Sequence, residues 1–357
     1  MRISSPLPAL SVLILIALGC GNKKEYKLPD WPWEDPVQAD TVAQSDTAAP
    51  VDPVVPEGPA WTDVSAEYSG LPEYVKIFKA PSKLEGQNAV AFIADVDLSK
   101  AGFGVWGLND PELQGCSDAL KTPSQVYSAQ GNPAVVINGG YFYSSGGKNY
   151  AASLAVSGGT LLSPNINYAS EDWVSIYYPT RAVFLAHKDG TCEAAWSYFK
   201  SASEHWVYQQ PAENDWSNKP LKAPSASFPS AGAKLEAENG IGGGPLLLKD
   251  GELRNTFKFE LFDGSSGIGP TVRAPRTAIG VTPEKRLVLF VCEGRNQTPD
   301  VPGFTTEEVA GILKDYGCSD AINLDGGGSS LMLVCGKELI KPSDGKQRSV
   351  GSCVFVK

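Results

Sequence analysis

Short apolar stretches bounded by turn residues are the feature that most constrains the fold of this chain. Stretches of this length, separated by Gly, Pro and Asp, are typical of β-strands and hairpins. The clearest ones are residues 89–98, 134–138, 182–186, 246–248, 277–281, 287–292, 321–324 and 331–334. The sequence therefore predicts an α+β fold with mixed, mainly antiparallel sheets and a few helices.

Two segments have the features of helices. Residues 306–316 place apolar side chains at helical spacing, and Thr305 and Glu308 form a capping box before them. A shorter helix over residues 124–130 is predicted after the N-cap residue Thr122. Each of these helices leads into one of the predicted buried strands.

Residues 196–240 are rich in Trp, Ser, Pro and Ala and carry little regular pattern. We expect an inserted loop region over one face of the domain. Trp196, Trp206 and Trp216 are spaced by ten residues, which is compatible with a sugar-stacking platform or with packing inside the loop. Of these two interpretations, packing is favoured.

The N-terminal part indicates export. Residues 1–19 contain one Arg, an apolar core and small residues before Cys20, which is typical of a lipoprotein signal peptide. Lipid on the Cys20 thiol would anchor the chain at the bacterial cell envelope, preferably the outer membrane; a plain cleaved signal is the alternative. Residues 20–60 are rich in Pro and acidic residues and are predicted to form a disordered tether before a single large domain, 61–357.

Charge and residue counts exclude several classes of function. The formal net charge is −10 and there is no Lys- or Arg-rich run, so no nucleic-acid partner is expected. The chain contains only two histidines, so a His-based metal site or a catalytic triad is not expected. Six cysteines remain after Cys20, and disulfides or buried free thiols both stay open: Cys116, Cys192, Cys292, Cys318, Cys335 and Cys353.

Three glycine clusters follow or interrupt predicted strands, at residues 138–142, 242–245 and 323–330. Glycine allows close backbone approach and lets N–H groups point at an oxygen-rich ligand, although tight turns are the simpler explanation for 242–245. The last cluster places the Asp325 carboxylate, glycine amides and two hydroxyls within one turn. Arg276 and Arg295 are the basic residues that could clamp a phosphate beside it.

Several of these segments together resemble the phosphodiester glycosidase family. The similarity spans about residues 85–357, in the same order as in the family, and NLDGGGSS with RTAIG upstream is its most specific combination. The matching strings are NGGYF at 138–142, GGGPLLLKDGEL at 242–253, RTAIG at 276–280, RLVLFVCEGR at 286–295 and the stretch 305–330, with Arg348 near the last strand. One departure is Glu293-Gly294, where the family usually has Asp-Gly.

The resemblance implies hydrolysis of a sugar-1-phosphodiester at the glycosidic C–O bond. Asp325 and Glu293 would be the catalytic carboxylates, and Arg276 and Arg295 would hold the phosphate. Asn138 and Asn323 would bond sugar hydroxyls or orient a carboxylate. The remaining substrate-binding candidates are Gly139, Gly140, Gly326, Gly327, Gly328, Ser329 and Ser330.

Other functions are compatible with the same residues. A non-catalytic glycan-binding or envelope-assembly lipoprotein would keep the fold without hydrolysis, and a phosphodiesterase would cleave the P–O bond. We expect no cofactor and no metal, although Asp325, Glu293 and loop carbonyls could instead hold a hard cation such as Ca²⁺. The expected partner is a glycan or glycosyl-phosphate substrate, and contact with a membrane is expected through the lipid alone.

Overall fold

The computed structural model describes residues 60–356, which lie within one compact unit, Gly58–Lys357. The predicted signal peptide, Cys20 and the tether up to residue 59 fall outside the described residues. Within the described part, none of the helices has the length and apolar character needed to cross a membrane. The predicted single large domain corresponds to this described unit.

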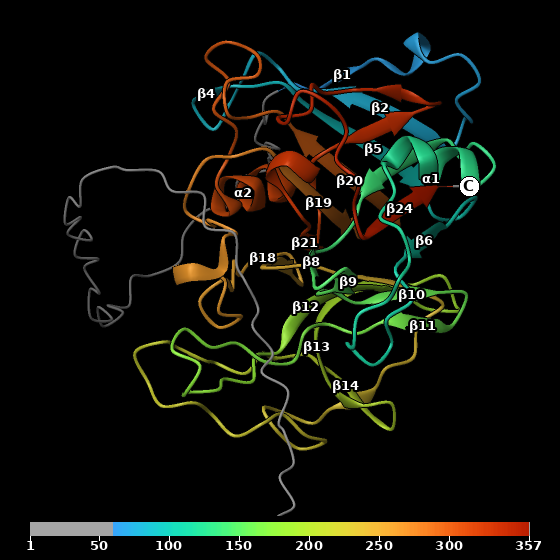
Figure 1. Ribbon diagram of the computed structural model, residues 1–357. Helices are drawn as coiled ribbons and strands as arrows, with labels where there is room; N and C mark the ends of the chain where they lie inside the picture. Colours follow the sequence, from blue (N-terminus) through green and yellow to red (C-terminus); the bar gives the residue numbers. More distant parts are fainter. Residues whose placement is uncertain (1–59, 357) are drawn as a thin grey trace, which may run out of the picture. The chain divides into compact units, whose positions relative to one another are not determined.

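The largest sheet has eight strands and is antiparallel throughout (Figure 1). Its spatial order is β1 (Thr62–Asp63), β2 (Val75–Lys79), β5 (Ala91–Asp97), β20 (Arg286–Cys292), β19 (Arg276–Val281), β21 (Asp320–Asn323), β17 (Leu246–Lys249) and β18 (Glu252–Leu253). The predicted strand segments 246–248, 277–281 and 287–292 are confirmed as β17, β19 and β20, and the pairs β19–β20 and β17–β18 are antiparallel hairpins.

A second, seven-stranded sheet forms the lower part of the view in Figure 1. Its order is β11 (Thr160–Ser163), β10 (Ala155–Ser157), β16 (Asn239–Gly242), β12 (Arg181–Ala186), β13 (Cys192–Ser201), β14 (Glu204–Tyr208) and β15 (Ala233–Lys234). The expectation of an inserted loop over residues 196–240 is therefore wrong for its first part. Trp196 lies in β13 and is buried in the core, so it cannot form a sugar platform.

A third sheet has five strands, and two short hairpins stand apart from the sheets. The five-stranded order is β23 (Lys337–Glu338), β22 (Met332–Val334), β7 (Val135–Asn138), β24 (Ser352–Val356) and β6 (Phe103–Gly107). The hairpins are β3 (Lys83–Leu84) with β4 (Gln87–Asn88) and β8 (Phe142–Ser145) with β9 (Lys148–Ala151).

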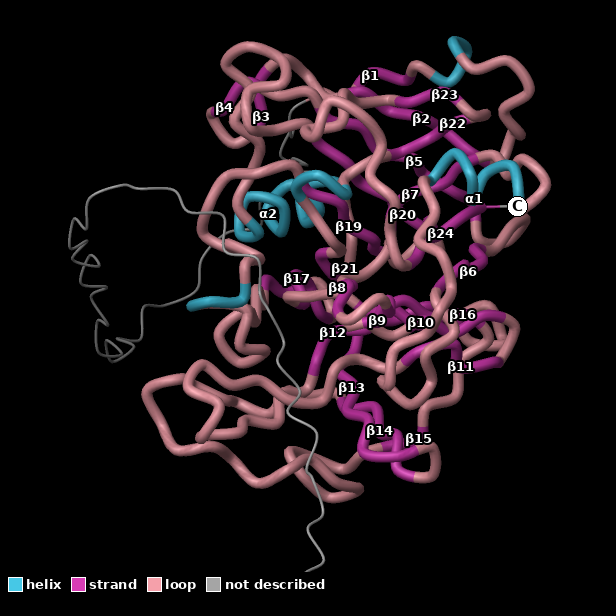
Figure 2. Tube along the Cα trace, in the orientation of Figure 1, coloured by secondary structure: helices cyan, strands magenta, loops and turns pink. Residues whose placement is uncertain are grey.

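Helices are few, as Figure 2 shows. The two α-helices are α1 (Pro123–Ala129) and α2 (Thr306–Tyr316); the capping box predicted at Thr305 begins α2, and the predicted N-cap residue Thr122 forms a capping box with Gln125 at the start of α1. The described residues also contain three single turns of 3₁₀ helix, η1 (Ser65–Glu67), η2 (Gly264–Ser266) and η3 (Gly327–Ser329). The predicted fold class and the positions of both helices are confirmed.

Alternating side chains of β20 divide the core into two layers. Leu287, Leu289 and Val291 pack into a cluster shared with the five-stranded sheet and with part of the seven-stranded sheet. Val288 and Phe290 point to the opposite face, which α2 covers. Burial on both faces explains why the central strands of the largest sheet are almost continuously apolar.

The six cysteines of the described residues are all free thiols. Cys192, Cys292 and Cys353 lie in strands β13, β20 and β24, and Cys292, Cys318 and Cys353 are buried. Burial raises the pKa of each of these three thiols. The disulfides left open by the sequence are therefore not formed in this structure.

Candidate active site

The three glycine clusters meet at one place. The main-chain N–H of Asp325 donates to the Gly139 carbonyl over 3.0 Å, and the N–H of Gly244 donates to the Asn323 carbonyl over 2.7 Å. A methyl group on Gly243 would overlap that same Asn323 oxygen. Glycine is needed here because the ends of β7, β16 and β21 approach one another more closely than side chains would allow.

Asn138 orients the chain that carries Asp325. Its Oδ1 accepts hydrogen bonds from the Thr277 hydroxyl at 2.7 Å and the Leu331 amide at 3.1 Å. Its Nδ2 donates to the Asp325 main-chain carbonyl at 2.7 Å. Because Asn138 is fully buried, it holds the segment around Asp325 in place and does not present its amide to a sugar hydroxyl.

Asn323 is also fully buried. Its Nδ2 lies 3.0 Å from the Tyr141 hydroxyl and 2.9 Å from the Gly244 carbonyl, so it links two of the glycine clusters. The predicted contact of Asn323 with a sugar hydroxyl is therefore not supported. Its Oδ1 is buried without a hydrogen-bond partner.

Gly139 and Gly140 bind other parts of the protein. The Gly139 N–H donates to the Ser352 carbonyl at 2.8 Å, and the Gly140 N–H donates to the Ser352 hydroxyl at 3.0 Å. With both amides occupied and buried, the prediction that they bind substrate is wrong for this conformation. They join β7 to the neighbouring strand β24.

Asp325 is the carboxylate at the centre of the site. It keeps partial exposure, yet burial by the surrounding protein raises its pKa to about 6. A hydrogen bond with Ser329, the charge of Arg348, the Gly326 amide and the charge of Arg295 all act in the opposite direction. A carboxyl group with this pKa can exchange its proton near neutral pH, which suits acid–base or electrostatic catalysis.

One amide of the glycine loop remains free to donate. Gly326 N–H bonds the Asp325 carboxylate at 2.8 Å, and Gly327 N–H bonds the Pro275 carbonyl at 2.8 Å. The Ser329 and Ser330 amides donate back to carbonyls in the same turn. Among the described residues, none accepts a hydrogen bond from the amide of Gly328.

Arg295 and Arg348 flank this free amide. The Arg295 guanidinium lies against Gly327, is exposed, and has one weak bond, 3.4 Å to the Ser343 hydroxyl. The Arg348 guanidinium packs over Gly328 together with the Asp344 carboxylate, to which it donates at 2.6 and 2.9 Å. Two arginines and the buried Gly328, whose amide has no hydrogen-bond partner among the described residues, thus lie beside Asp325; we call this group the cradle, because paired arginine donors are suited to bind an anion.

Arg276 has a different role from the predicted one. It is 2% exposed, and its guanidinium donates to four main-chain carbonyls. These belong to Ile268, Gly269, Val272 and Phe304. Because one N–H of five remains, Arg276 cannot clamp a phosphate with two parallel bonds. It instead fixes the 268–272 loop beside the glycine turn.

Glu293 does not face the site. It is 3% exposed; its Oε1 accepts the Lys341 N–H at 2.9 Å, and its Oε2 is buried without a partner. Its predicted role as the second catalytic carboxylate is therefore not supported by the structure. Glu293 holds the start of the segment that carries Ser343, Asp344 and Arg348.

Arg181 is a buried arginine that the sequence analysis did not single out. It lies at the start of β12, and its guanidinium stacks on the Phe262 ring with 4.1 Å between Cζ and the ring centroid. The Phe262 ring in turn packs against Tyr141 at 5.5 Å between centroids. The signal in the sequence was an arginine directly before the apolar stretch 182–186, which alone does not indicate burial.

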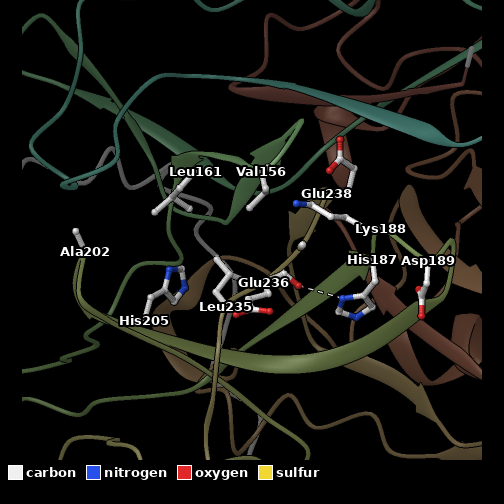
Figure 3. Close-up of a pocket in the computed structure, with 12 residues that line it drawn as sticks. Val156, Leu161, His187, Lys188, Asp189, Ala202, His205, Leu235, Glu236 and Glu238 are labelled. Carbon is white, nitrogen blue, oxygen red and sulfur yellow. Dashed lines mark hydrogen bonds between the residues drawn. The ribbon is translucent and has the colours of Figure 1, made fainter.

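A cavity lies away from Asp325, on the other large sheet. It measures about 740 Å³ on the seven-stranded sheet and is lined by both histidines, His187 and His205 (Figure 3). His187 contacts the Glu236 carbonyl at 3.0 Å. Within residues 60–356, no group of three or more His, Cys, Asp or Glu side chains is arranged to hold a metal ion.

Fold and site together define a mainly antiparallel β-protein with an acidic group beside an anion cradle. A family model described as phosphodiester glycosidase matches residues 131–357. The chain therefore belongs to the phosphodiester glycosidase family.

Two curated proteins are similar over short segments. Mouse N-acetylglucosamine-1-phosphodiester alpha-N-acetylglucosaminidase is 35% identical over 82 residues, which is 23% of this chain and 15% of that protein. The SPbeta prophage-derived uncharacterized protein YomE of Bacillus subtilis (strain 168) is 38% identical over 79 residues, 22% of this chain and 12% of that protein. The matched segments thus span far less than two thirds of either relative.

Two solved structures share the fold. The catalytic domain of zebrafish N-acetylglucosamine-1-phosphodiester alpha-N-acetylglucosaminidase superposes with a TM-score of 0.51 at 22% identity, covering 83% of this chain and 87% of that chain. A hypothetical protein from Synechocystis gives a TM-score of 0.52 at 17% identity, covering 84% and 64%. These similarities support the mainly antiparallel architecture.

Proposed function

We propose that this protein hydrolyses a sugar-1-phosphodiester of an envelope or extracellular glycan and releases the free sugar. The observation that carries the proposal is the position of Asp325 beside the anion cradle of Arg295, Arg348 and the Gly328 amide. The family to which the chain belongs supports the same chemistry.

The cradle and the carboxylate would do different work. Arg295, Arg348 and the Gly328 N–H hold the phosphate and stabilise the charge that it gains as it leaves the sugar. Ionised Asp325 stabilises the positive charge that develops at the anomeric carbon or activates the attacking water. Because a phosphomonoester is already a good leaving group, strong help from a general acid is not required.

The test uses the full-length protein and the p-nitrophenyl diester of N-acetylglucosamine-1-phosphate. We expect wild type to release free sugar and Asp325→Asn to lower kcat at least a hundredfold. Asp315→Asn is the control, because Asp315 is exposed on α2. Wild-type rates in Asp325→Asn would contradict the assignment, and no release by wild type from a panel of sugar-1-phosphodiesters would favour a non-catalytic glycan-binding protein.

The position of bond cleavage is tested separately. Hydrolysis in ¹⁸O-water places the label in the sugar when the C–O bond breaks and in the phosphate when the P–O bond breaks. We expect the label in the sugar. Label in the phosphate would make the protein a phosphodiesterase.

We also propose export and lipid anchoring through Cys20. The apolar stretch and small residues before Cys20 support this. Labelled palmitate should enter the wild-type chain in cells and should not enter Cys20→Ala. Equal labelling of both would contradict a lipid on this thiol.

A further inference from the structure

Arg181 is a buried cation whose hydrogen-bonding groups are unused. It is 8% exposed, and within the described residues its guanidinium has neither a hydrogen-bond acceptor nor an ion-pair partner. Its Nε is sealed from solvent, whereas Nη1 and Nη2 are not. An arginine carries five N–H donors, and leaving them unsatisfied in a buried place is costly unless a ligand accepts them.

The nearby carboxylate of Glu260 does not satisfy Arg181. Glu260 Oε1 accepts the Leu246 amide and the Thr256 hydroxyl, both at 2.7 Å, and Oε2 accepts the Ala182 amide at 2.8 Å. No ion pair joins Glu260 to Arg181 in the described residues. Glu260 lowers the electrostatic cost from a distance but supplies no acceptor to the guanidinium.

Arg181 and the catalytic carboxylate border the same pair of aromatic rings. Arg181 stacks on Phe262, which packs against Tyr141. The Tyr141 hydroxyl contacts Asn323, two residues before Asp325, and burial followed by the charge of Asp325 raises the pKa of Tyr141. Phe262, which is 2% exposed, and Tyr141 thus connect Arg181 to the segment that carries Asp325.

We infer that Arg181 is a substrate subsite for a carboxylate outside the scissile diester, so that the preferred substrate is the phosphodiester of an acidic sugar such as a uronic acid. The two accessible nitrogens, Nη1 and Nη2, match the two oxygens of a planar carboxylate. A site built around such a donor pair discriminates against a substrate without the acceptor, because the buried donors then stay unpaired. This inference rests on the proposed glycosyl-phosphate hydrolysis.

The experiment compares two substrates that differ at one carbon. These are the p-nitrophenyl diesters of glucose-1-phosphate and of glucuronic acid 1-phosphate, with CH₂OH or carboxylate at C6. We expect wild type to favour the glucuronosyl diester at least tenfold in kcat/KM. Arg181→Gln should lower this ratio at least tenfold, and Arg254→Gln, at an exposed arginine, should leave it unchanged.

A ratio near one in wild type, or an unchanged ratio in Arg181→Gln, would overturn the inference. If wild type hydrolyses neither diester, the proposed function fails, and the binding affinities of the two sugar phosphates test the role of Arg181 instead. Glucuronic acid 1-phosphate should then bind at least tenfold more tightly than glucose-1-phosphate, and equal affinities would refute the subsite.

If Arg181→Gln does not fold, Arg181→Lys replaces it and should lose part of the preference, since lysine keeps the charge without the paired donors. If neither variant folds, the wild-type ratio decides.

Discussion

The side-chain amide of Asn138 donates a hydrogen bond of 2.7 Å to the main-chain carbonyl of Asp325, 187 positions away in the sequence. The same side chain accepts hydrogen bonds from Thr277 and Leu331. One buried amide therefore connects the ends of β7, β19 and β21 with the strand that follows the glycine turn. The position of the Asp325 segment depends on this connection.

Asn138→Asp is predicted to disturb the site and the fold together. The substitution replaces the donor Nδ2 by an oxygen that faces the Asp325 carbonyl, so a hydrogen bond becomes a repulsion. We expect a loss of about 1–3 kcal/mol in the free energy of unfolding, measured in urea, and a loss of hydrolysis. Asn88→Asp, at an exposed position of β4, is the control. Unchanged stability and activity in Asn138→Asp would show that this connection is dispensable.

The raised pKa of Asp325 predicts the pH dependence of hydrolysis. If the ionised carboxylate acts, kcat/KM should rise with pH and reach half of its maximum near pH 6. The measurement is a pH profile with the p-nitrophenyl diester. A rate that falls as pH rises through 6 would assign Asp325 as a general acid instead.

The same pKa predicts the pH dependence of stability. The pKa of Asp325 is about 6 in the folded protein and about 3.9 for an unperturbed Asp, so the folded state binds more protons between these values. Stability contributed by this group therefore falls as pH rises through that window. Asp325→Asn should unfold at a higher urea concentration than wild type above pH 6, and the difference should shrink toward pH 4. A difference that is constant with pH would contradict the shift.

Gly243→Ala tests the close approach of the glycine clusters. The added methyl group would overlap the main-chain oxygen of Asn323, which cannot move without displacing β21. We expect a destabilisation of more than about 2 kcal/mol, together with loss of activity. Gly102→Ala is the matched control, since no atom lies within 4 Å of its added methyl, and it should change stability by less than about 0.5 kcal/mol. Equal effects at the two positions would argue against close packing at Gly243.

The Arg348–Asp344 pair predicts how the protein responds to inorganic phosphate. Asp344 occupies two donors of Arg348, and phosphate must compete with it. Asp344→Asn should therefore lower the inhibition constant of phosphate about tenfold, and Arg348→Gln should raise it by a similar factor, as expected for a charge-assisted hydrogen bond of about 1.5–3 kcal/mol. Arg273→Gln, which breaks a surface pair with Glu308, is the control. The cradle assignment fails if neither variant at positions 344 and 348 changes the inhibition.

Local sequence patterns predicted most of the fold. The N-cap at Thr122, the capping box at Thr305 and the neighbouring strands 277–281 and 287–292 depend on residues close in sequence, and the structure contains all of them. The strand Cys192–Ser201 was missed because it is buried on both faces of a sheet, so its side chains show no alternation of apolar and polar types.

The site was predicted less completely, because a side chain's environment is set by segments far away in sequence. Asp325 is partly exposed and Arg295 is exposed beside the glycine turn, whereas the side chains of Arg276 and Glu293 are buried and bonded to main-chain groups that local sequence patterns do not predict. The residues next to an arginine in the sequence also do not predict how exposed its side chain is. Arg181 and Arg348 acquire their roles from Phe262 and Asp344, which lie on other elements.

The meeting of three glycine clusters also bears on how activity arises during folding. Contacts between segments nearly 190 positions apart form late, because a long loop must close before they yield any stabilisation. No single glycine cluster forms the site by itself, because each cluster depends on hydrogen bonds with the other two. After dilution from urea, we expect hydrolysis to recover at the rate of the slowest refolding phase, because the site forms only when all three clusters are in place.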